Sequence, residues 1–288
     1  MRNLLRDAVA LFEKNQISAV DAEILLAHII GVSRKQLITS TFELPEEEIA
    51  RVSEEFHGLV EQRLLGKPVQ YITGSAPFRY LELSVGEGVL IPRPETEILV
   101  DRVIGFLQSK KLNQSDKQEI KSVVDLGAGS GAISIAIATE AAIKGLNVTV
   151  VAVEKSPAAA QWLNLNISKY ELATRVVVED VATALEGVKA DVVVANPPYI
   201  PNQQALPHEV IGFEPELALR GGDGDGMEIP TQFIVAAARL LKSGGYFILE
   251  HHESQGELVK KVMANEFNNI QGISDLTGRD RFTSGKRV

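Results

Sequence analysis

Apolar residues recur with two different periodicities along the chain, and the first of them covers about the first 65 residues. There, apolar positions recur at the three- and four-residue spacing that places them on one face of a helix. One such stripe runs through residues 45–65, and another starts after Ser18, a residue type that caps helices, and stops at Gly31. The pattern predicts a small helical domain over residues 1–68.

The second pattern starts near residue 122, where short runs of Val, Ile and Leu alternate with helical segments. Strands are predicted at residues 122–126, 148–153, 175–179, 191–195 and 245–250, and two more in the tail, residues 268–288, around Gly278. Helices are predicted at residues 95–108, 131–142, 157–169 and 229–241. Because strands buried on both faces read as continuous apolar runs, the pattern predicts an α/β domain with a doubly wound parallel sheet over residues 95–288.

Residues 69–94 differ from both regions because they are rich in aromatic residues, β-branched residues, Gly and Pro. This composition is typical of strands separated by turns. We therefore expect a β-hairpin linker that joins the helical domain to the α/β domain.

Composition narrows the classes of partner and cofactor. The 288 residues carry a net charge of −9, which argues against wrapping nucleic acid by neutralising phosphates, so no nucleic-acid partner is expected. The chain has no Cys, and its five His residues show no H-E-x-x-H spacing, so no metal is expected. Neither an apolar run of membrane-spanning length nor a signal peptide is recognisable, so we expect a cytoplasmic protein without a membrane partner. A monomer is the default expectation.

A glycine-rich loop, DLGAGSG at residues 125–131, lies between the first predicted strand of the α/β domain and its helix. Glycines let the backbone pass close to a ligand, and the start of a helix offers free N–H groups and the positive end of the helix dipole. Gly127, Gly129 and Ala132 also satisfy the fingerprint G-x-G-x-x-G/A of dinucleotide-binding loops. The loop therefore predicts a nucleotide-type ligand.

Acidic residues at strand ends narrow the choice of ligand. Glu154 ends the second predicted strand of the sheet, where a carboxylate can accept both hydroxyls of an adenosine ribose. NAD and S-adenosylmethionine both contain that ribose, but Asp125 would crowd a pyrophosphate, whereas it suits the ammonium group of a methionine moiety. S-adenosylmethionine is therefore favoured, and Asp180, at the end of the third strand, is expected near the adenine amino group.

The stretch ANPPYIPN, residues 195–202, follows the fourth predicted strand, which adjoins the first strand in doubly wound sheets. A planar NH₂ group reacts with a methyl donor more readily when two acceptors hold its protons and turn its lone pair toward the methyl carbon. The side-chain oxygen of Asn196 and the carbonyl of Pro197, whose direction the prolines fix, are candidate acceptors. Tyr199 is expected to stack on the planar group, so catalysis would rest mostly on positioning in a dry pocket.

These motifs resemble those of a known family. S-adenosylmethionine-dependent amino methyltransferases share an (Asn/Asp)-Pro-Pro-(Tyr/Phe) motif. More narrowly, the chain is similar to the bacterial release factor glutamine methyltransferases of the PrmC/HemK family in VLIPRPETEILVD (89–101), VVDLGAGSGAISIAIA (123–138), NPPYIP (196–201), FEPELALRGGDGDG (213–226) and GRDRF (278–282). The resemblance covers nearly the whole chain. It implies a class I S-adenosylmethionine-dependent methyltransferase, with a Rossmann-like doubly wound sheet, a small helical amino-terminal domain and a β-hairpin linker.

The resemblance also implies an activity and roles for individual residues. Members of the family methylate the amide nitrogen (N5) of the glutamine in the Gly-Gly-Gln motif of peptide chain release factors, and the amino-terminal domain helps to grip the release factor. The implied catalytic and substrate-binding residues are Asn196, Pro197, Pro198 and Tyr199, with Arg93 and Glu95 near the mouth of the site. The implied S-adenosylmethionine ligands are Asp125, Gly127, Ala128, Gly129, Ser130, Gly131, Glu154, Asp180, Val181 and Asn196. Val181 departs from the pattern, because some members have an aromatic residue there beside the adenine.

Two other functions stay open at this point. An adenine-specific (N6) nucleic-acid methyltransferase could use the same acceptors, since an adenine amine is also a planar NH₂ group. Such enzymes usually need a target-recognition region and a basic surface, and neither is visible in this sequence. A non-catalytic binding module could keep the fold only as a scaffold, but the intact glycine loop, Glu154 and Asn196 argue against it.

Overall fold

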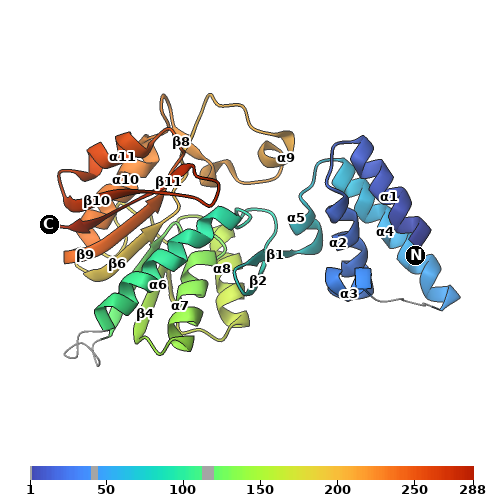
Figure 1. Ribbon diagram of the computed structural model, residues 1–288, viewed down its shortest axis with the longest axis horizontal. Helices are drawn as coiled ribbons and strands as arrows, with labels where there is room; N and C mark the ends of the chain where they lie inside the picture. Colours follow the sequence, from blue (N-terminus) through green and yellow to red (C-terminus); the bar gives the residue numbers. More distant parts are fainter. Residues whose placement is uncertain (1, 40–44, 112–119) are drawn as a thin grey trace. The chain divides into compact units, whose positions relative to one another are not determined.

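The computed structural model describes residues 2–39, 45–111 and 120–288, and it consists of two compact units (Figure 1). The first unit comprises Met1–Ser75 and Leu206–Phe213, and the second comprises Ala76–Ala205 and Glu214–Val288. The first unit is helical, and the second contains the main sheet.

The first unit is built from short helices around an apolar core. Its helices are α1 (Arg2–Lys14), α2 (Ala19–Ile30), α3 (Arg34–Thr39), α4 (Glu46–Leu64), α5 (Val69–Thr73) and α9 (His208–Ile211). Phe12, Leu25 and Phe56 are fully buried in this core. The helical character predicted for the start of the chain is confirmed, because the apolar stripes of α1, α2 and α4 face one shared core.

Side-chain contacts fix the ends of α2 and the place of α9 within the first unit. Ser18 caps α2, since its side chain accepts from the N–H of Val20, and Gly31 ends the helix with a φ of 74°. The Arg63 side chain, on α4, donates to Asp21 of α2 at 2.8 Å and to Glu209 of α9 at 2.9 Å. This mostly buried guanidinium thus joins a late segment of the chain to the amino-terminal helices.

Residues 69–73, expected in the β-hairpin, form the helix α5 instead. The helix starts after Pro68 and ends at Gly74, whose φ is 72°. The hairpin itself is shorter than expected and consists of β1 (Ser75–Phe78) and β2 (Leu81–Ser84), which pair as a two-stranded sheet. β-Branched and aromatic side chains favour strands only weakly, and here burial of the α5 side chains decides the local structure.

The second unit is organised around a seven-stranded sheet with the order β10-β11-β9-β6-β3-β4-β5. Its strands are β3 (Lys121–Leu126), β4 (Val148–Val153), β5 (Arg175–Val177), β6 (Ala190–Ala195), β9 (Leu241–Glu250), β10 (Phe267–Ser274) and β11 (Asp280–Arg287). The strands from β9 to β5 run parallel, and β11 and β10 are antiparallel to their neighbours. The predicted doubly wound sheet is confirmed, including the two tail strands.

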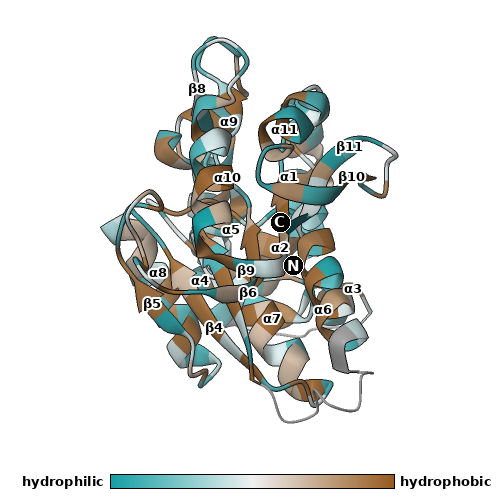
Figure 2. Cartoon of the chain, turned by 90° about the vertical axis from the view of Figure 1, so that its left-hand side faces the viewer, coloured by the Kyte–Doolittle hydropathy of each residue, from teal (hydrophilic) through white to brown (hydrophobic). Residues whose placement is uncertain are grey.

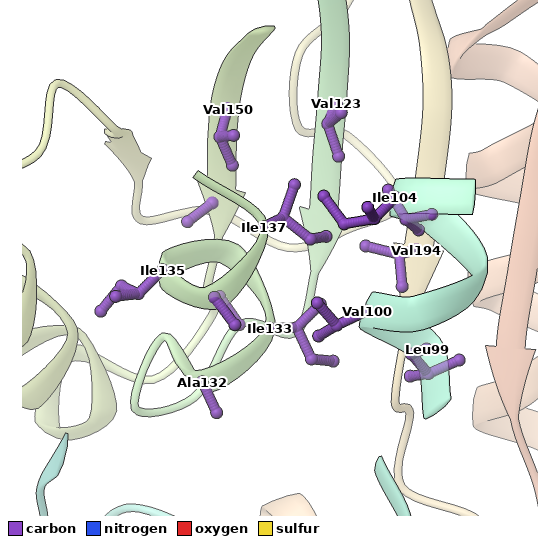
Figure 3. Packing of buried hydrophobic residues seen from close by; sticks show 14 of the residues in the cluster. Leu99, Val100, Ile104, Val123, Ala132, Ile133, Ile135, Ile137, Val150 and Val194 are labelled. Carbon is purple, nitrogen blue, oxygen red and sulfur yellow. The ribbon is translucent and has the colours of Figure 1, made fainter. Parts of the chain in front are cut away.

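Helices cover both faces of this sheet. α6 (Glu97–Lys111), α7 (Ala132–Ile143) and α8 (Pro157–Lys169) share one apolar core with it, and α10 (Glu228–Leu240) and α11 (Gly256–Met263) share another. Figure 3 shows Ile104 of α6 and Ile137 of α7 packed together with Val123 of β3. In Figure 2, β4 is mostly brown, the colour of hydrophobic residues, as expected for a strand with helices on both sides.

The strand order reverses at β3. The chain runs from β3 outward to β4 and β5 and then crosses to β6, on the other side of β3. Leu126 of β3 pairs with Ala195 of β6, so the glycine loop and Asn196 begin at adjacent strand ends. Ligands of doubly wound sheets bind at such a switch point, beside the carboxyl ends of the strands.

Some elements differ from those predicted. β5 ends at Val177, two residues early, and β9 begins at Leu241, before the predicted start at residue 245. The helix α11 was not predicted. Neither was a small parallel sheet of β7 (Ile200–Pro201) and β8 (Arg220–Gly222), which follows the Asn-Pro-Pro-Tyr motif.

Candidate active site

A pocket lies at the carboxyl ends of the central strands of the second unit. Its walls come from the glycine loop, the residues after β4, β5 and β6, the segment between β2 and α6, and α10. The expected site residues that line the pocket are Arg93, Gly127, Ala128, Gly129, Ser130, Glu154, Asp180, Val181, Asn196 and Pro198. The expected site residues outside its lining are Glu95, Asp125, Gly131, Pro197 and Tyr199.

Three glycines shape the loop beside the pocket. Gly127, Gly129 and Gly131 have φ values of 71°, 56° and 86°, which L side chains rarely adopt. Space is also tight at two of them: a Cβ on Gly131 would lie 2.7 Å from the Leu163 side chain, and one on Gly127 would lie 3.1 Å from the Phe233 ring. Gly131 is the residue before α7, so the loop leads directly into the free N–H groups of a helix start.

Glu154 is a mostly buried carboxylate at the end of β4, with an exposure of 8%. One of its oxygens accepts from the N–H of Gly129 at 2.8 Å, and the other accepts from the N–H of Ser156 at 2.7 Å. A carboxylate has about four acceptor positions. Glu154 therefore braces the glycine loop and still has capacity for two hydroxyl donors.

Asp125 lies at the end of β3 and is fully buried. Its Oδ2 accepts from the N–H of Ser134 in α7 at 3.0 Å, and its Oδ1 has no hydrogen-bond partner among the described residues. Burial raises the pKa of this carboxyl to about 7, and the interactions with Ser134 only partly oppose that effect. The carboxyl therefore lacks one donor or one positive charge.

Asp180 and Val181 line the part of the pocket beyond β5. The Asp180 carboxylate is paired with Lys155 at 2.7 Å and accepts from the N–H of Ala182 at 2.9 Å. The bond from Lys155, followed by that from Ala182, lowers the pKa of Asp180. Val181 is buried, and its carbonyl accepts from the Arg239 side chain at 3.0 Å, which helps to fix this wall of the pocket.

The Asn196 side chain has a defined orientation at the pocket. Its amide nitrogen donates to the hydroxyl of Thr96 at 3.1 Å. No donor to its side-chain oxygen is found in the described part of the chain. The amide oxygen of Asn196 is thus left as an acceptor, next to the glycine loop.

Next to Asn196 lies a group of buried polar residues, among them Thr96 of the pocket lining and Glu250, to which the sequence analysis assigned no specific role. Thr96 donates to Glu250 at 2.7 Å, and the hydroxyl of Tyr199 donates to the other oxygen of Glu250 at 3.1 Å. Both Thr96 and Glu250 are buried. A signal for Glu250 existed, because it is an acid at the carboxyl end of a strand, the same position that identified Glu154.

The main chain of the Asn-Pro-Pro-Tyr motif is held from its other side. The side-chain amide of Gln255 donates to the Tyr199 carbonyl at 2.9 Å and to the Asp225 carbonyl at 2.7 Å. Gly221 packs directly on this backbone, because a Cβ there would lie 2.7 Å from the Cα of Tyr199. The glycine-rich stretch at residues 221–226 therefore supports the backbone of the motif.

Arg93 is fixed by an acid that the sequence did not single out. Its guanidinium donates to Glu214 at 2.6 Å, and the other oxygen of Glu214 accepts from the N–H of Ile91 at 3.1 Å. Glu214 has an exposure of only 5%, whereas the Arg93 side chain is 31% exposed. Glu214 thus joins the segment before α6 to the loop after α9 and holds Arg93 at the pocket wall.

Within residues 2–39, 45–111 and 120–288, no helix is both long and apolar enough to cross a bilayer. The same residues contain no group of three or more acidic or His side chains placed to hold a metal ion.

Family models match both units of the chain. Residues 3–74 match the PrmC N-terminal domain, and residues 107–212 match the methyltransferase small domain. The fold resembles that of a 16S rRNA methyltransferase from T. thermophilus, solved in complex with AdoMet and guanosine. The TM-score is 0.51 at 20% sequence identity, covering 74% of this chain and 50% of that chain. Fold and site together define a class I S-adenosylmethionine-dependent methyltransferase.

Full-length relatives narrow the family. A release factor glutamine methyltransferase from Bifidobacterium longum is 39% identical over 279 residues, which cover 91% of this chain and 90% of that protein. One from Corynebacterium glutamicum is 34% identical over 300 aligned positions, which cover 99% of this chain and 98% of that protein. The chain belongs to the family of release factor glutamine methyltransferases.

Proposed function

We propose that this protein transfers a methyl group from S-adenosylmethionine to the side-chain amide nitrogen (N5) of the glutamine in the Gly-Gly-Gln motif of peptide chain release factors. The observation that carries the proposal is the orientation of Asn196, whose amide nitrogen is bonded to Thr96 and whose oxygen is left as an acceptor at the pocket. The names of the relatives support release factors as the substrate class.

Methylation of an amide nitrogen depends more on positioning the nitrogen than on a strong base. A primary amide nitrogen is a poor nucleophile because its lone pair is delocalised into the carbonyl. The Asn196 oxygen and the Pro197 carbonyl would accept its two N–H bonds and hold the nitrogen with its lone pair directed at the donor. S-adenosylmethionine supplies the electrophilic methyl group when it is bound. Tyr199 would contact the planar substrate group from the same motif.

The residues of the pocket fit S-adenosylmethionine. The loop at Gly127 and Gly129 offers close backbone approach, and Glu154 has acceptor capacity left for two ribose hydroxyls. Asp125 does not line the pocket, but it lies two residues before Gly127, and its orphaned oxygen suits the ammonium group of the methionine moiety. Asp180 and Val181 would border the adenine.

The ribose assignment predicts that Glu154→Gln weakens binding of S-adenosylmethionine by roughly 10- to 100-fold, the loss expected for charge-assisted hydrogen bonds. The amide nitrogen of glutamine would also face the N–H of Gly129 or of Ser156, both donors, so the loop loses a brace. Isothermal titration calorimetry measures the dissociation constant. Glu186→Gln, the same change at an exposed position, is the control and should bind like the wild type. Equal constants for both variants would remove Glu154 from the ribose site.

The function itself is tested by transfer of labelled methyl groups. Incubation with methyl-labelled S-adenosylmethionine and a release factor should label the release factor, and mass spectrometry should place the label on the glutamine of the Gly-Gly-Gln motif. A release factor with that glutamine replaced by alanine should stay unlabelled.

The same assay separates the rival functions. Label on adenine of DNA or RNA, with none on the release factor, would select the nucleic-acid methyltransferase. Binding of the release factor without any transfer, under conditions where S-adenosylmethionine binds, would select the non-catalytic module.

The first unit would contribute recognition of the release factor rather than chemistry, since the residues that line the pocket lie in the second unit. We propose residues 1–68 as a substrate-recognition domain, residues 69–94 as a linker and residues 95–288 as the catalytic domain. A cytoplasmic location and a monomeric state remain predictions.

A further inference from the structure

We propose that Thr96 and Glu250 are positioning residues that fix which end of the Asn196 side-chain amide faces the substrate. The proposal rests on the proposed function, because it assigns the acceptor role to the Asn196 oxygen. Neither residue belongs to the Asn-Pro-Pro-Tyr motif, and they come from distant elements: Thr96 precedes α6, and Glu250 ends β9.

Without fixed neighbours, an asparagine side-chain amide has no preferred orientation of its oxygen and its NH₂ group. Rotation of its terminal group by half a turn exchanges NH₂ and oxygen at almost no steric cost, since the two groups have nearly the same shape. An NH₂ group directed at the substrate would repel the substrate's own N–H groups. The catalytic geometry therefore needs a neighbour of Asn196 that accepts a hydrogen bond and cannot donate one.

Thr96 alone does not meet that requirement, because a hydroxyl can both donate and accept. Its single proton is directed away from Asn196 by Glu250, which accepts it at 2.7 Å. Only lone pairs of the Thr96 oxygen then remain for Asn196, whose amide nitrogen donates to them at 3.1 Å. The ionised Glu250 carboxylate thus fixes the direction of the Thr96 hydroxyl proton, and the Thr96 oxygen in turn fixes the orientation of the Asn196 amide.

The surroundings of Glu250 support this arrangement when the carboxylate is ionised. Its second oxygen accepts from the Tyr199 hydroxyl at 3.1 Å, so each carboxylate oxygen has a donor from the protein. The charged or titratable groups that act on it are Tyr199 from the motif, Glu95 from the turn before α6, and Arg281 from β11. Glu250 is fully buried and does not line the pocket, whereas Thr96 does.

A pair of substitutions at Thr96 tests the role. Thr96→Val keeps the shape but removes the acceptor, so we expect kcat for release factor methylation to fall about 10- to 100-fold, as when a reacting group is misplaced. KM for the release factor and affinity for S-adenosylmethionine should change far less. Thr96→Ser keeps a hydroxyl and should restore most of the lost turnover.

A matched control separates positioning from packing. Thr139→Val makes the same chemical change in α7, at a buried hydroxyl that has no hydrogen-bond partner among the described residues. This variant should turn over like the wild type. If Thr96→Val and Thr139→Val have the same kcat, or if Thr96→Ser fails to recover turnover, the positioning role is wrong.

Glu250→Gln provides a second, independent readout through pH. Burial, as the largest cause, raises the pKa of Glu250 to about 7, so the ionised form that fixes Thr96 becomes dominant as pH rises through that value. The wild-type kcat at saturating S-adenosylmethionine should therefore rise across neutral pH. Glutamine can present either its oxygen or its NH₂ group to Thr96, so the variant should be slower and should lose this step in its kcat profile.

Saturation with S-adenosylmethionine separates this step from Asp125, whose titration would affect binding of the cofactor. A pH step that persists unchanged in Glu250→Gln would overturn the proposal even if Thr96→Val fails to fold. The proposed function fails separately: if the wild-type protein labels no release factor, the substrate assignment is wrong, whereas wild-type labelling with no effect of Thr96→Val or Glu250→Gln contradicts only the positioning role.

Discussion

Asn196→Ala should lower kcat for release factor methylation by roughly 10²–10³-fold, the loss typical of removing one preorganised polar group from a transition-state site. The affinity for S-adenosylmethionine should stay within a few-fold of the wild type, because the glycine loop and Glu154 are intact. Single-turnover kinetics with labelled S-adenosylmethionine measures the chemical step, and calorimetry measures binding.

The size of this effect follows from what the side chain does. It would accept one N–H of the substrate amide, and that bond orients the nitrogen only while the Asn196 oxygen faces the pocket. Alanine removes the acceptor and also leaves the Thr96 hydroxyl without its donor in a buried place. The Pro197 carbonyl alone can hold one substrate proton but cannot define the direction of the lone pair.

Asn202→Ala is the matched control for this prediction. Asn202 lies in the same stretch of chain, is exposed, and donates its side-chain amide to Asp223 at 2.8 Å, outside the pocket lining. Its replacement should leave kcat unchanged. Wild-type turnover in Asn196→Ala would refute the acceptor role, whereas equal losses in both variants would point to a general disturbance of the loop.

Local sequence patterns were enough for the sheet and for ten of the fifteen expected site residues, which line the pocket. β3 and β6 each contain a run of Val whose residues are buried, and the glycine loop and Asn196 follow these two strands. Because β3 and β6 pair directly, a rule of fold topology brings these two segments together without any knowledge of side-chain contacts.

The roles of Thr96 and Glu250 were not predicted, because each role depends on a partner that is distant in the sequence. The bond between Thr96 and Glu250 joins positions 154 residues apart, so neither the motif around Thr96 nor the strand-end position of Glu250 shows that these two side chains meet. Helix α5 was not predicted for a related reason, since Val69 and Tyr71 favour strands by propensity but are buried in a helical unit. Local patterns predict periodic elements well, but they do not show which side chains meet.

Asp125→Asn should make the protein more stable at pH 8 and at the same time weaken S-adenosylmethionine binding roughly 10- to 100-fold. The stability change follows from the fully buried carboxyl, whose pKa is raised from 3.8 to about 7. A raised pKa means that the folded state holds a proton that the unfolded state has released. The stability contributed by this proton is present below about pH 4 and is lost as pH rises through about 7.

Whether Asp125→Asn is more or less stable than the wild type at pH 8 depends on the size of two opposing free-energy terms. The shift corresponds to at most about 4 kcal/mol of unfolding free energy lost when Asp125 ionises. Asparagine avoids that loss and its oxygen can still accept from Ser134, but its NH₂ group meets a place without an acceptor, which costs about 1–3 kcal/mol. A net gain of roughly 1–3 kcal/mol should appear in denaturant titrations of the cofactor-free protein at pH 8, and it should turn into a loss of about 1–3 kcal/mol near pH 4, where the Asp125 carboxyl is protonated and only the cost of the unpaired NH₂ group remains.

Asp191→Asn is the control with the opposite expected sign. Burial acts to raise the pKa of Asp191, but hydrogen bonds from Ser122 and Lys242 outweigh it and hold the pKa below its usual value. Removing that charge should therefore lower stability at pH 8. If Asp125→Asn also loses stability there while cofactor affinity is kept, its carboxylate is satisfied within the fold. A gain in stability with a loss of affinity would instead mean that Asp125 is strained in the free protein because its missing partner is the cofactor's ammonium group.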